Sequence, residues 1–154
     1  MSFSHLNNQG EAHIVDVSSR EISERIAYAS GKVTMSAEVI SDIQSGDVEK
    51  GDVLATARVA GIMAAKKTSD LIPLCHPISI QKVEITFEIK GNSIYIKSVV
   101  KNVDRTGVEM EALTAVSIAG LTLIDMIKSM DARAELSDIH IDSKSGGRSG
   151  DWLR

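Results

Sequence analysis

The sequence IQKVEITFEIK GN SIYIKSVVKN, residues 80 to 102, decides the fold of this chain. Apolar and polar residues alternate over 80–90 and again over 93–102, which is the period of a half-buried strand. Gly91 and Asn92 lie between the two segments and tolerate the positive φ that a tight turn requires. The stretch therefore predicts a β-hairpin.

A strand and two helices are predicted before the hairpin. Residues 26–35 fit a strand, in which Gly31 is expected to mark a bulge. Ser36 is expected to cap a short helix that ends near Gly46. A second helix, rich in small residues that allow close packing, is expected over about 52–68.

A long helix, over about 108–130, and a last strand, over about 134–141, are predicted after the hairpin. The order β-α-β-β-α-β, allowing for the extra short helix, is the ferredoxin-like split βαβ pattern. We therefore predict an α+β fold in which helices pack on an antiparallel sheet. The long helix is apolar on nearly every side, although one sheet face covers only one side of a helix. A neighbouring subunit is the simplest expected cover for the remainder.

Length and composition predict one soluble domain over 1–154, with a polar N-terminal arm (about 1–23) and a Gly/Ser/basic tail (about 143–154). The 154 residues are 43% hydrophobic and 25% charged, as in ordinary globular proteins. The single cysteine excludes an internal disulfide, and the first residues lack the basic and apolar regions of a signal peptide, so a cytoplasmic location is expected. The apolar run 112–124 falls short of the ~20 residues that span a bilayer, so no membrane association is expected.

Charge and aromatic content argue against a nucleic-acid partner. The formal net charge is −4 and 3% of the residues are aromatic. Nucleic-acid binders, by contrast, use many lysines and arginines against phosphates and aromatic rings against bases. A local group of lysines can still bind an anionic small molecule within an acidic protein.

Three polar clusters interrupt the apolar sequence. The first, KKTSDLIPLCHP over 66–77, holds both prolines and the only cysteine. Because each proline fixes its own φ and biases the preceding residue away from helix, this segment is expected to leave a helix and stay extended. The other clusters are TGVEME over 106–111 and DMIK over 125–128. We regard all three as candidates for chemistry.

At these residues the chain resembles the MoaC family of cyclic pyranopterin monophosphate synthases, which act in molybdenum cofactor biosynthesis. The similarity continues through GEAH (10–13), VDV (15–17), KGDV (50–53), ATAR (55–58) and KSGGRSGD (144–151). It implies the same ferredoxin-like fold and a homohexamer, a trimer of dimers, with active sites between subunits. It also implies a lyase that converts (8S)-3',8-cyclo-7,8-dihydroguanosine 5'-triphosphate into cyclic pyranopterin monophosphate and diphosphate by acid–base catalysis. No cofactor is implied, with room for a magnesium ion on the triphosphate.

Asp125 and Lys128 stand at i, i+3 on the predicted long helix. The plain interpretation is a surface ion pair, which is common on helices. The apolar residues that flank the pair favour another interpretation, because a lysine beside apolar surface can have a lowered pKa and an aspartate one turn away can orient it. The resemblance implies that Asp125 and Lys128 are catalytic, together with Lys50.

Glu109 and Glu111 fall in the first turn of that helix, where carboxylates interact favourably with the helix dipole. At i, i+2 their side chains diverge by about 200° on a regular helix, so both reach one site only if the chain before Met110 is extended. The resemblance implies that Met110 and Glu111 contact the substrate, with Glu111 gripping the donor edge of a guanine-like ring. Glu109 is a further candidate for a substrate contact.

Leu74, Cys75 and His76 match a substrate-binding stretch of the family. Cys75 and His76 are adjacent in an expected extended loop, so they point in opposite directions and are not expected to form a nucleophilic pair. A buried structural cysteine is the alternative for Cys75, while His76 is expected to donate to the substrate or transfer a proton. The histidines follow no zinc-site spacing, and no metal site is expected.

Four lysines can be interpreted either as ordinary surface charges or as phosphate ligands. They are Lys50, Lys66, Lys67 and Lys144. Lys50 precedes a helix start, where backbone N–H groups favour anions. The resemblance implies that Lys50, with Lys66 or Lys67, holds the triphosphate as diphosphate leaves, and that Lys144 contacts the substrate. The loop SGGRSG over 145–150 is either a flap that closes over phosphates or a flexible C-terminus.

Glu111 and Asp125 lie about 21 Å apart along one helix. Either the substrate is long or the two residues meet across an interface, and we expect a pocket built from at least two chains.

Two other classes of function stay open. A small-molecule-binding regulatory module gives no reason for polar residues within an apolar helix, and a metal-dependent phosphohydrolase would explain the phosphate groups and carboxylates.

Overall fold

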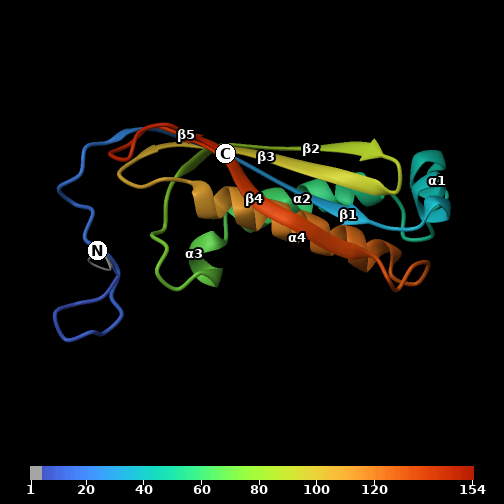
Figure 1. Ribbon diagram of the computed structural model, residues 1–154, viewed down its shortest axis with the longest axis horizontal. Coiled ribbons are helices and arrows are strands. Elements are labelled where there is room, and N and C mark those ends of the chain that lie inside the picture. The colour runs from blue at the N-terminus through green and yellow to red at the C-terminus, as the bar shows by residue number, and fades with distance from the viewer. Residues whose placement is uncertain (1–4) are drawn as a thin grey trace.

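Figure 1 shows the computed structural model of the chain, which describes residues 5–154. Residues 1–4, the first part of the expected N-terminal arm, lie outside the described residues. The elements in chain order are β1 (Ser23–Thr34), α1 (Ala37–Ser45), α2 (Val53–Ala65), α3 (Thr68–Leu71), β2 (Ile80–Lys90), β3 (Ser93–Asp104), α4 (Glu109–Ile127), β4 (Glu135–Ser145) and β5 (Trp152–Leu153).

The strands lie in the order β2-β3-β1-β4-β5, and each neighbouring pair is antiparallel. With β5 set aside, the chain is a βαββαβ unit with β1 between β3 and β4, so the predicted ferredoxin-like α+β fold is confirmed. In Figure 1, α2 and α4 run side by side beneath the sheet. The α4 helix contacts β1, β3 and β4, whereas α2 contacts β2. The apolar core lies between these helices and the sheet.

The predicted hairpin is also confirmed. A two-residue turn links Lys90 to Ser93, and Gly91 has a φ of 56°, as glycine has at the first central position of a type II′ turn. Alternate residues of β3, beginning with Ile94 and Ile96, are buried. The alternation in the sequence therefore marks the face of the hairpin that meets the helices.

A bulge lies at the expected place, but its extra residue belongs to β4 rather than β1. Across from Gly31, β4 holds one residue more than β1, and Asp138 has a positive φ of 55° there. Gly31 serves helix packing as well, because a Cβ at this position would lie 2.8 Å from Val116 Cγ1 in α4.

The predicted starts of α1, α2 and α4 are close to the observed ones, but α2 is shorter than expected. The Ser36 hydroxyl accepts a hydrogen bond from a backbone N–H of α1, as predicted. The α2 helix ends at Ala65, and the Thr68 hydroxyl donates to the Ala65 carbonyl at 3.0 Å, which satisfies one of the free acceptors at the helix end. A separate helical turn, α3 (Thr68–Leu71), then follows, so the extended conformation expected after about residue 68 is wrong for residues 69–71.

The C-terminal segment also differs from the expected tail. The β4 strand continues to Ser145, and β5 folds back on it, with Trp152 paired to Lys144. Asp151 ties the intervening loop, because its carboxylate accepts from the Gly146 N–H at 3.0 Å. The polar residues at the end of β4 carry no strand signal of their own, and pairing with β1 supplies the support that the local sequence lacks.

Among the described residues, α4 alone is long and apolar enough to pass for a membrane span by length and composition. It is the core helix of this fold. Its fully buried positions are Ala112, Ala115, Val116, Ala119, Leu123 and Ile127. The α2 helix covers part of the side that the sheet leaves open, which the sequence had assigned to a neighbouring subunit. Leu121 of α4 stays 53% exposed, and Val59 and Met63 of α2 are exposed as well.

We expect Gly61→Ala to destabilise the protein, because Gly61 lies where α2 packs on α4. A Cβ there would meet Ile85 and lie 2.8 Å from the Ala115 carbonyl oxygen, which is backbone and cannot rotate away. Overpacking of this kind costs about 1–3 kcal/mol, against a gain of ~1 kcal/mol in helix propensity. Gly120→Ala is the matched control, because the three atoms nearest to its Cβ would all belong to the Leu136 side chain, which can rotate. In urea unfolding, the Gly61→Ala protein should have a lower free energy of unfolding than the Gly120→Ala protein. Equal stabilities would contradict this packing.

Candidate functional site

A cavity of about 370 Å³ at the N-terminal end of α4 brings together six of the predicted substrate-binding residues. These are Leu74, Cys75, His76, Glu109, Met110 and Glu111. The loop before β2 supplies the first three, and the first turn of α4 supplies the others. The N-terminal arm closes another side with Val15, Val17 and Arg20. Two polar clusters that are distant in sequence therefore form one site in the fold.

Glu109 and Glu111 both line this cavity, although α4 already begins at Glu109. The expected extended start before Met110 is therefore not the reason that both side chains reach one site. The Glu109 side chain lies instead against Gly107, whose missing Cβ leaves room for the carboxylate. A glycine two residues before Glu109 thus lets the two carboxylates share the cavity.

Glu111 is the only charged residue between positions 5 and 154 that is buried, at 4% exposed. Burial raises its pKa to about 7, opposed by a backbone hydrogen bond and reinforced by the nearby Glu109 carboxylate. Near neutral pH the group is therefore present in both protonation states. The ionised form accepts hydrogen bonds from a donor edge, and the protonated form can also donate one.

We expect the protein to lose stability relative to a Glu111→Gln variant as pH rises from about 5 to 8. The carboxyl group has an ordinary pKa of 4.5 in the unfolded chain and a pKa of about 7 in the folded one. Between these values the folded state holds the extra proton, so each rise in pH favours unfolding, by at most ~1.4 kcal/mol per unit. The urea midpoints of both proteins, measured across this pH range, give the difference in stability. If the two midpoints change with pH in parallel, Glu111 is not the source of the loss.

Cys75 and His76 face the cavity without forming a nucleophilic pair. His76 Nε2 donates to the Val15 carbonyl at 2.7 Å, which ties this loop to the N-terminal arm and makes Nδ1 the acceptor of the neutral ring. Burial, and then the Glu111 carboxylate, raises the pKa of the Cys75 thiol, so the nucleophilic thiolate is disfavoured. Cys75 is half-buried, and it lines the cavity instead of filling the core.

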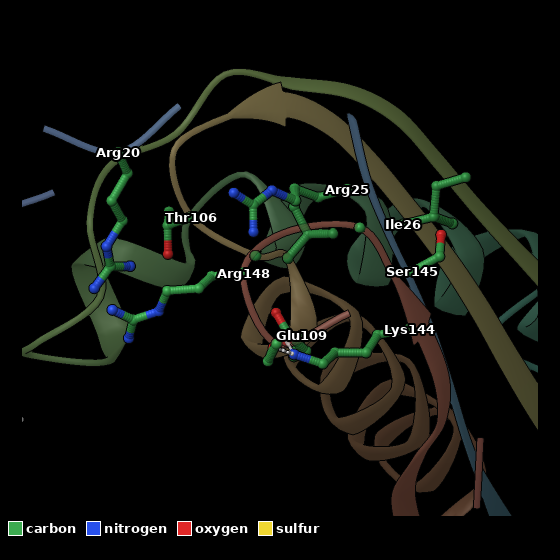
Figure 2. Close-up of a pocket in the computed structure, with 12 residues that line it drawn as sticks. Arg20, Arg25, Ile26, Thr106, Glu109, Lys144, Ser145 and Arg148 are labelled. Atoms are coloured by element: carbon green, nitrogen blue, oxygen red, sulfur yellow. Dashed lines mark hydrogen bonds and ion pairs between the residues drawn. The ribbon is translucent and has the colours of Figure 1, made fainter. Parts of the chain in front are cut away.

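A second cavity, of about 240 Å³, adjoins the first and shares Arg20, Thr106, Gly107 and Glu109 with it (Figure 2). Lys144 of β4 lines this cavity and pairs with the Glu109 carboxylate at 3.0 Å. Lys144 Nζ also donates to the Ser149 hydroxyl at 2.6 Å. One lysine thus joins the start of α4 to the loop between β4 and β5.

The predicted catalytic residues form a separate group at the other end of α4. Lys128 Nζ donates to Asp125 Oδ1 at 2.7 Å, and Lys50 Nζ donates to the Asp125 carbonyl oxygen at 2.6 Å. The hydrogen bond from Lys128, followed by the charges of Lys128 and Lys50, lowers the pKa of Asp125. All three side chains are 41% to 60% exposed. Lys128 itself is 60% exposed, and two of the apolar residues that flank it in sequence, Met126 and Ile127, are buried in the core.

Lys50 does not serve the helix start that follows it in sequence. There the Asp52 carboxylate accepts from the Ala55 N–H at 2.9 Å, so the chain's own anion occupies the place where the sequence suggested a phosphate. Lys50 instead places a cation at the C-terminal end of α4, where cations interact favourably with the helix dipole.

Two of the predicted lysines lie apart from both cavities. Lys66 and Lys67 are exposed at the end of α2 and line neither the 370 Å³ nor the 240 Å³ cavity. Lys67 lies 3.4 Å from the Asp70 carboxylate, as an exposed surface lysine does.

Sequence reasoning missed three arginines near these cavities. Arg20 lines both cavities, Arg25 lines the second, and Arg105 precedes the shared residue Thr106. Alternation along β1 could have revealed Arg25, because Ala27 and every second residue after it face the helices. Arg20 and Arg105 lie in loops, where no period applies.

The chain is similar to known proteins along nearly its whole length. Residues 14–147 match the family model described as the MoaC family. A cyclic pyranopterin monophosphate synthase of Streptomyces griseus is 51% identical over 150 residues, which cover 97% of this chain and 85% of that protein. Cyclic pyranopterin monophosphate synthase 2 of Mycobacterium bovis is 52% identical over 151 residues, 98% of this chain and 90% of the relative. The synthase of Desulfitobacterium hafniense is 50% identical over 155 residues, 100% and 95% of the two chains.

Proposed function

The chain belongs to the MoaC family, and we propose from this premise that it converts (8S)-3',8-cyclo-7,8-dihydroguanosine 5'-triphosphate into cyclic pyranopterin monophosphate and diphosphate. This is a lyase reaction of molybdenum cofactor biosynthesis. The observation that carries the proposal is sequence identity. About half of all residues, along almost the entire chain, are identical to those of relatives whose names state this product.

The residues divide into two roles. Lys128 acts as the general acid or base, Asp125 orients it, and Lys50 holds charge on the substrate phosphates. His76 and Met110 position the purine-derived ring in the larger cavity, and Glu111 accepts hydrogen bonds from its donor edge. The contacts of Lys50 and Lys128 to Asp125 support the first role, and the cavity lined by the other three supports the second.

In this proposal, two chains bring these two groups into one site. Glu111 and Asp125 are separated by about 21 Å of helix, and the Lys50–Asp125–Lys128 group of one chain is exposed and available to the cavity of another. We propose a homohexamer, a trimer of dimers, located in the cytoplasm, with the exposed apolar residues of α2 and α4 at subunit contacts. The scheme requires no cofactor, and a magnesium ion would enter with the triphosphate.

Incubation of the purified protein with the cyclised triphosphate tests the reaction. We expect diphosphate and the pterin product to appear in equal amounts. A folded protein that releases neither would overturn the proposal and favour a regulatory binding module. Release of inorganic phosphate or diphosphate without a pterin, abolished by a chelator, would favour a metal-dependent phosphohydrolase.

A further inference from the structure

Two hydrogen bonds attach the segment 36–50, which contains α1, to the end of α4. The first residue of this segment, Ser36, donates its backbone N–H to Asp131 Oδ2 at 2.8 Å. The last residue, Lys50, donates from Nζ to the Asp125 carbonyl oxygen at 2.6 Å. Figure 1 shows α1 at the end of the molecule where α4 ends. The segment that carries Lys50 is therefore fastened at both of its ends to one stretch of chain, residues 125–131.

The Asp131 carboxylate supplies an acceptor that α1 lacks in its own sequence. Ser36 is the N-cap of α1, and the N–H of such a residue is often bound by a glutamate or glutamine at the third helical position. That position is Val39 here, and Asp131 accepts the bond from 95 residues away. The other oxygen, Oδ1, accepts from the Arg133 N–H at 2.9 Å. The bond from Arg133, followed by that from Ser36, lowers the pKa of Asp131, so both are charge-assisted bonds near neutral pH.

The turn that holds Asp131 also closes the end of α4. Lys128 is the C-terminal cap of α4, and the Ile127 carbonyl accepts from the Asp131 N–H at 3.0 Å. The Asp125 carbonyl, which Lys50 binds, is another of the last free acceptors of this helix. Asp131 thus lies three residues after Lys128, in a turn that is bonded to α4 through its backbone and to the start of α1 through its side chain.

We propose that Asp131 is a positioning residue for the Lys50–Asp125–Lys128 group, an assignment that rests on the proposed function. It acts through the backbone, because it holds the start of α1 against the turn after Lys128 and so keeps the loop with Lys50 beside Asp125. The side chains of the group are 41% to 60% exposed, so their placement depends on the segments that carry them more than on core packing. Misplacement of a catalytic group by about 1 Å costs up to ~10²-fold in rate.

Trace acetylation of lysines in the full-length protein, read by peptide mass spectrometry, tests this role without turnover. We expect Asp131→Ala to raise the labelling rate of Lys50 about fivefold, the factor for one net hydrogen bond. Asp138→Ala is the matched control, because the Asp138 carboxylate pairs with Lys32 at 2.8 Å on the sheet. It should raise the labelling rate of Lys32 and leave that of Lys50 unchanged.

A second pair of variants removes the donor instead of the acceptor. Ser36 has a φ of −65° and a ψ of 153°, which proline adopts without strain, and proline has no N–H. Ser36→Pro should therefore raise the labelling rate of Lys50 as Asp131→Ala does. Ser36→Ala loses the capping hydroxyl but keeps the N–H, so it should leave Lys50 unchanged. This comparison stands even if Asp131→Ala does not fold.

Turnover of the cyclised triphosphate is measured on the same proteins, per folded molecule. We expect Asp131→Ala to lower kcat roughly 10- to 100-fold, and Asp138→Ala to leave kcat unchanged. A purely structural role would lower the urea midpoint and change neither kcat per folded molecule nor the labelling of Lys50. Equal labelling of Lys50 in these two proteins, or a wild-type kcat in the Asp131→Ala protein, would overturn the assignment. Labelling of Lys50 that depends on Asp131, in a wild type that makes no pterin, would refute the proposed function alone.

Discussion

Lys128→Ala is expected to abolish formation of the pterin product, with a rate loss of roughly 10²–10⁴-fold, the usual contribution of a general acid or base. The fold should survive the change. Lys128 is 60% exposed and its contact is a hydrogen bond to Asp125 at the helix surface, so no core packing is lost. The measurement is the initial rate of diphosphate release together with the urea midpoint of the same sample.

Two further variants show whether the loss belongs to proton transfer. Lys128→Arg keeps the positive charge but cannot give up a proton near neutral pH, so it should be as inactive as the alanine variant. Lys82→Ala is the control, because Lys82 of β2 forms a comparably exposed ion pair with Glu84 at 2.7 Å and lines neither the 370 Å³ nor the 240 Å³ cavity. A Lys128→Arg protein with near wild-type activity would show that Lys128 supplies charge alone. A Lys128→Ala protein with near wild-type activity would remove it from the mechanism.

Mixing two inactive variants, Glu111→Ala and Lys128→Ala, is expected to restore activity. One chain keeps an intact Lys50–Asp125–Lys128 group and the other keeps an intact cavity, so a site shared between them contains both. If subunits combine at random, about a quarter of the sites in a symmetric assembly are intact. The reason is the separation along α4, about 21 Å, which is too great for a small ligand to contact both groups of a single chain.

The experiment compares each variant alone with the pair after joint unfolding and refolding. Diphosphate release near a quarter of the wild-type rate is the expected result. Two separately refolded samples, mixed only at the end, control for partial recovery of either variant. If the co-refolded oligomers stay as inactive as their parents, the shared site is wrong and the substrate must reach both groups of one chain.

The sequence by itself determined the local elements, because their signals act over a few residues. Alternation over 80–102 predicts the hairpin, Gly91 its turn, and Ser36 a helix start, since the hairpin joins two consecutive strands and the cap bond lies within one helical turn. The end of α2 and the length of β4 were misjudged. The end of α2 depends on the conformation of Lys67 and a bond from Thr68, and the last residues of β4 are held by pairing with β1, which lies more than a hundred residues earlier.

The tertiary structure decided which candidate residues lie together in one site and how far each of them is buried. The sequence named Glu111, Lys128 and Lys144 but could not say that Glu111 is buried, that Lys128 is exposed, or that Lys144 pairs with Glu109. It likewise gave no sign that Arg20 lines both cavities. Cavities, desolvation and the pKa of about 7 at Glu111 arise when segments distant in sequence pack together. A local pattern carries no record of that packing, because the cost of burying a charge depends on every segment that surrounds it.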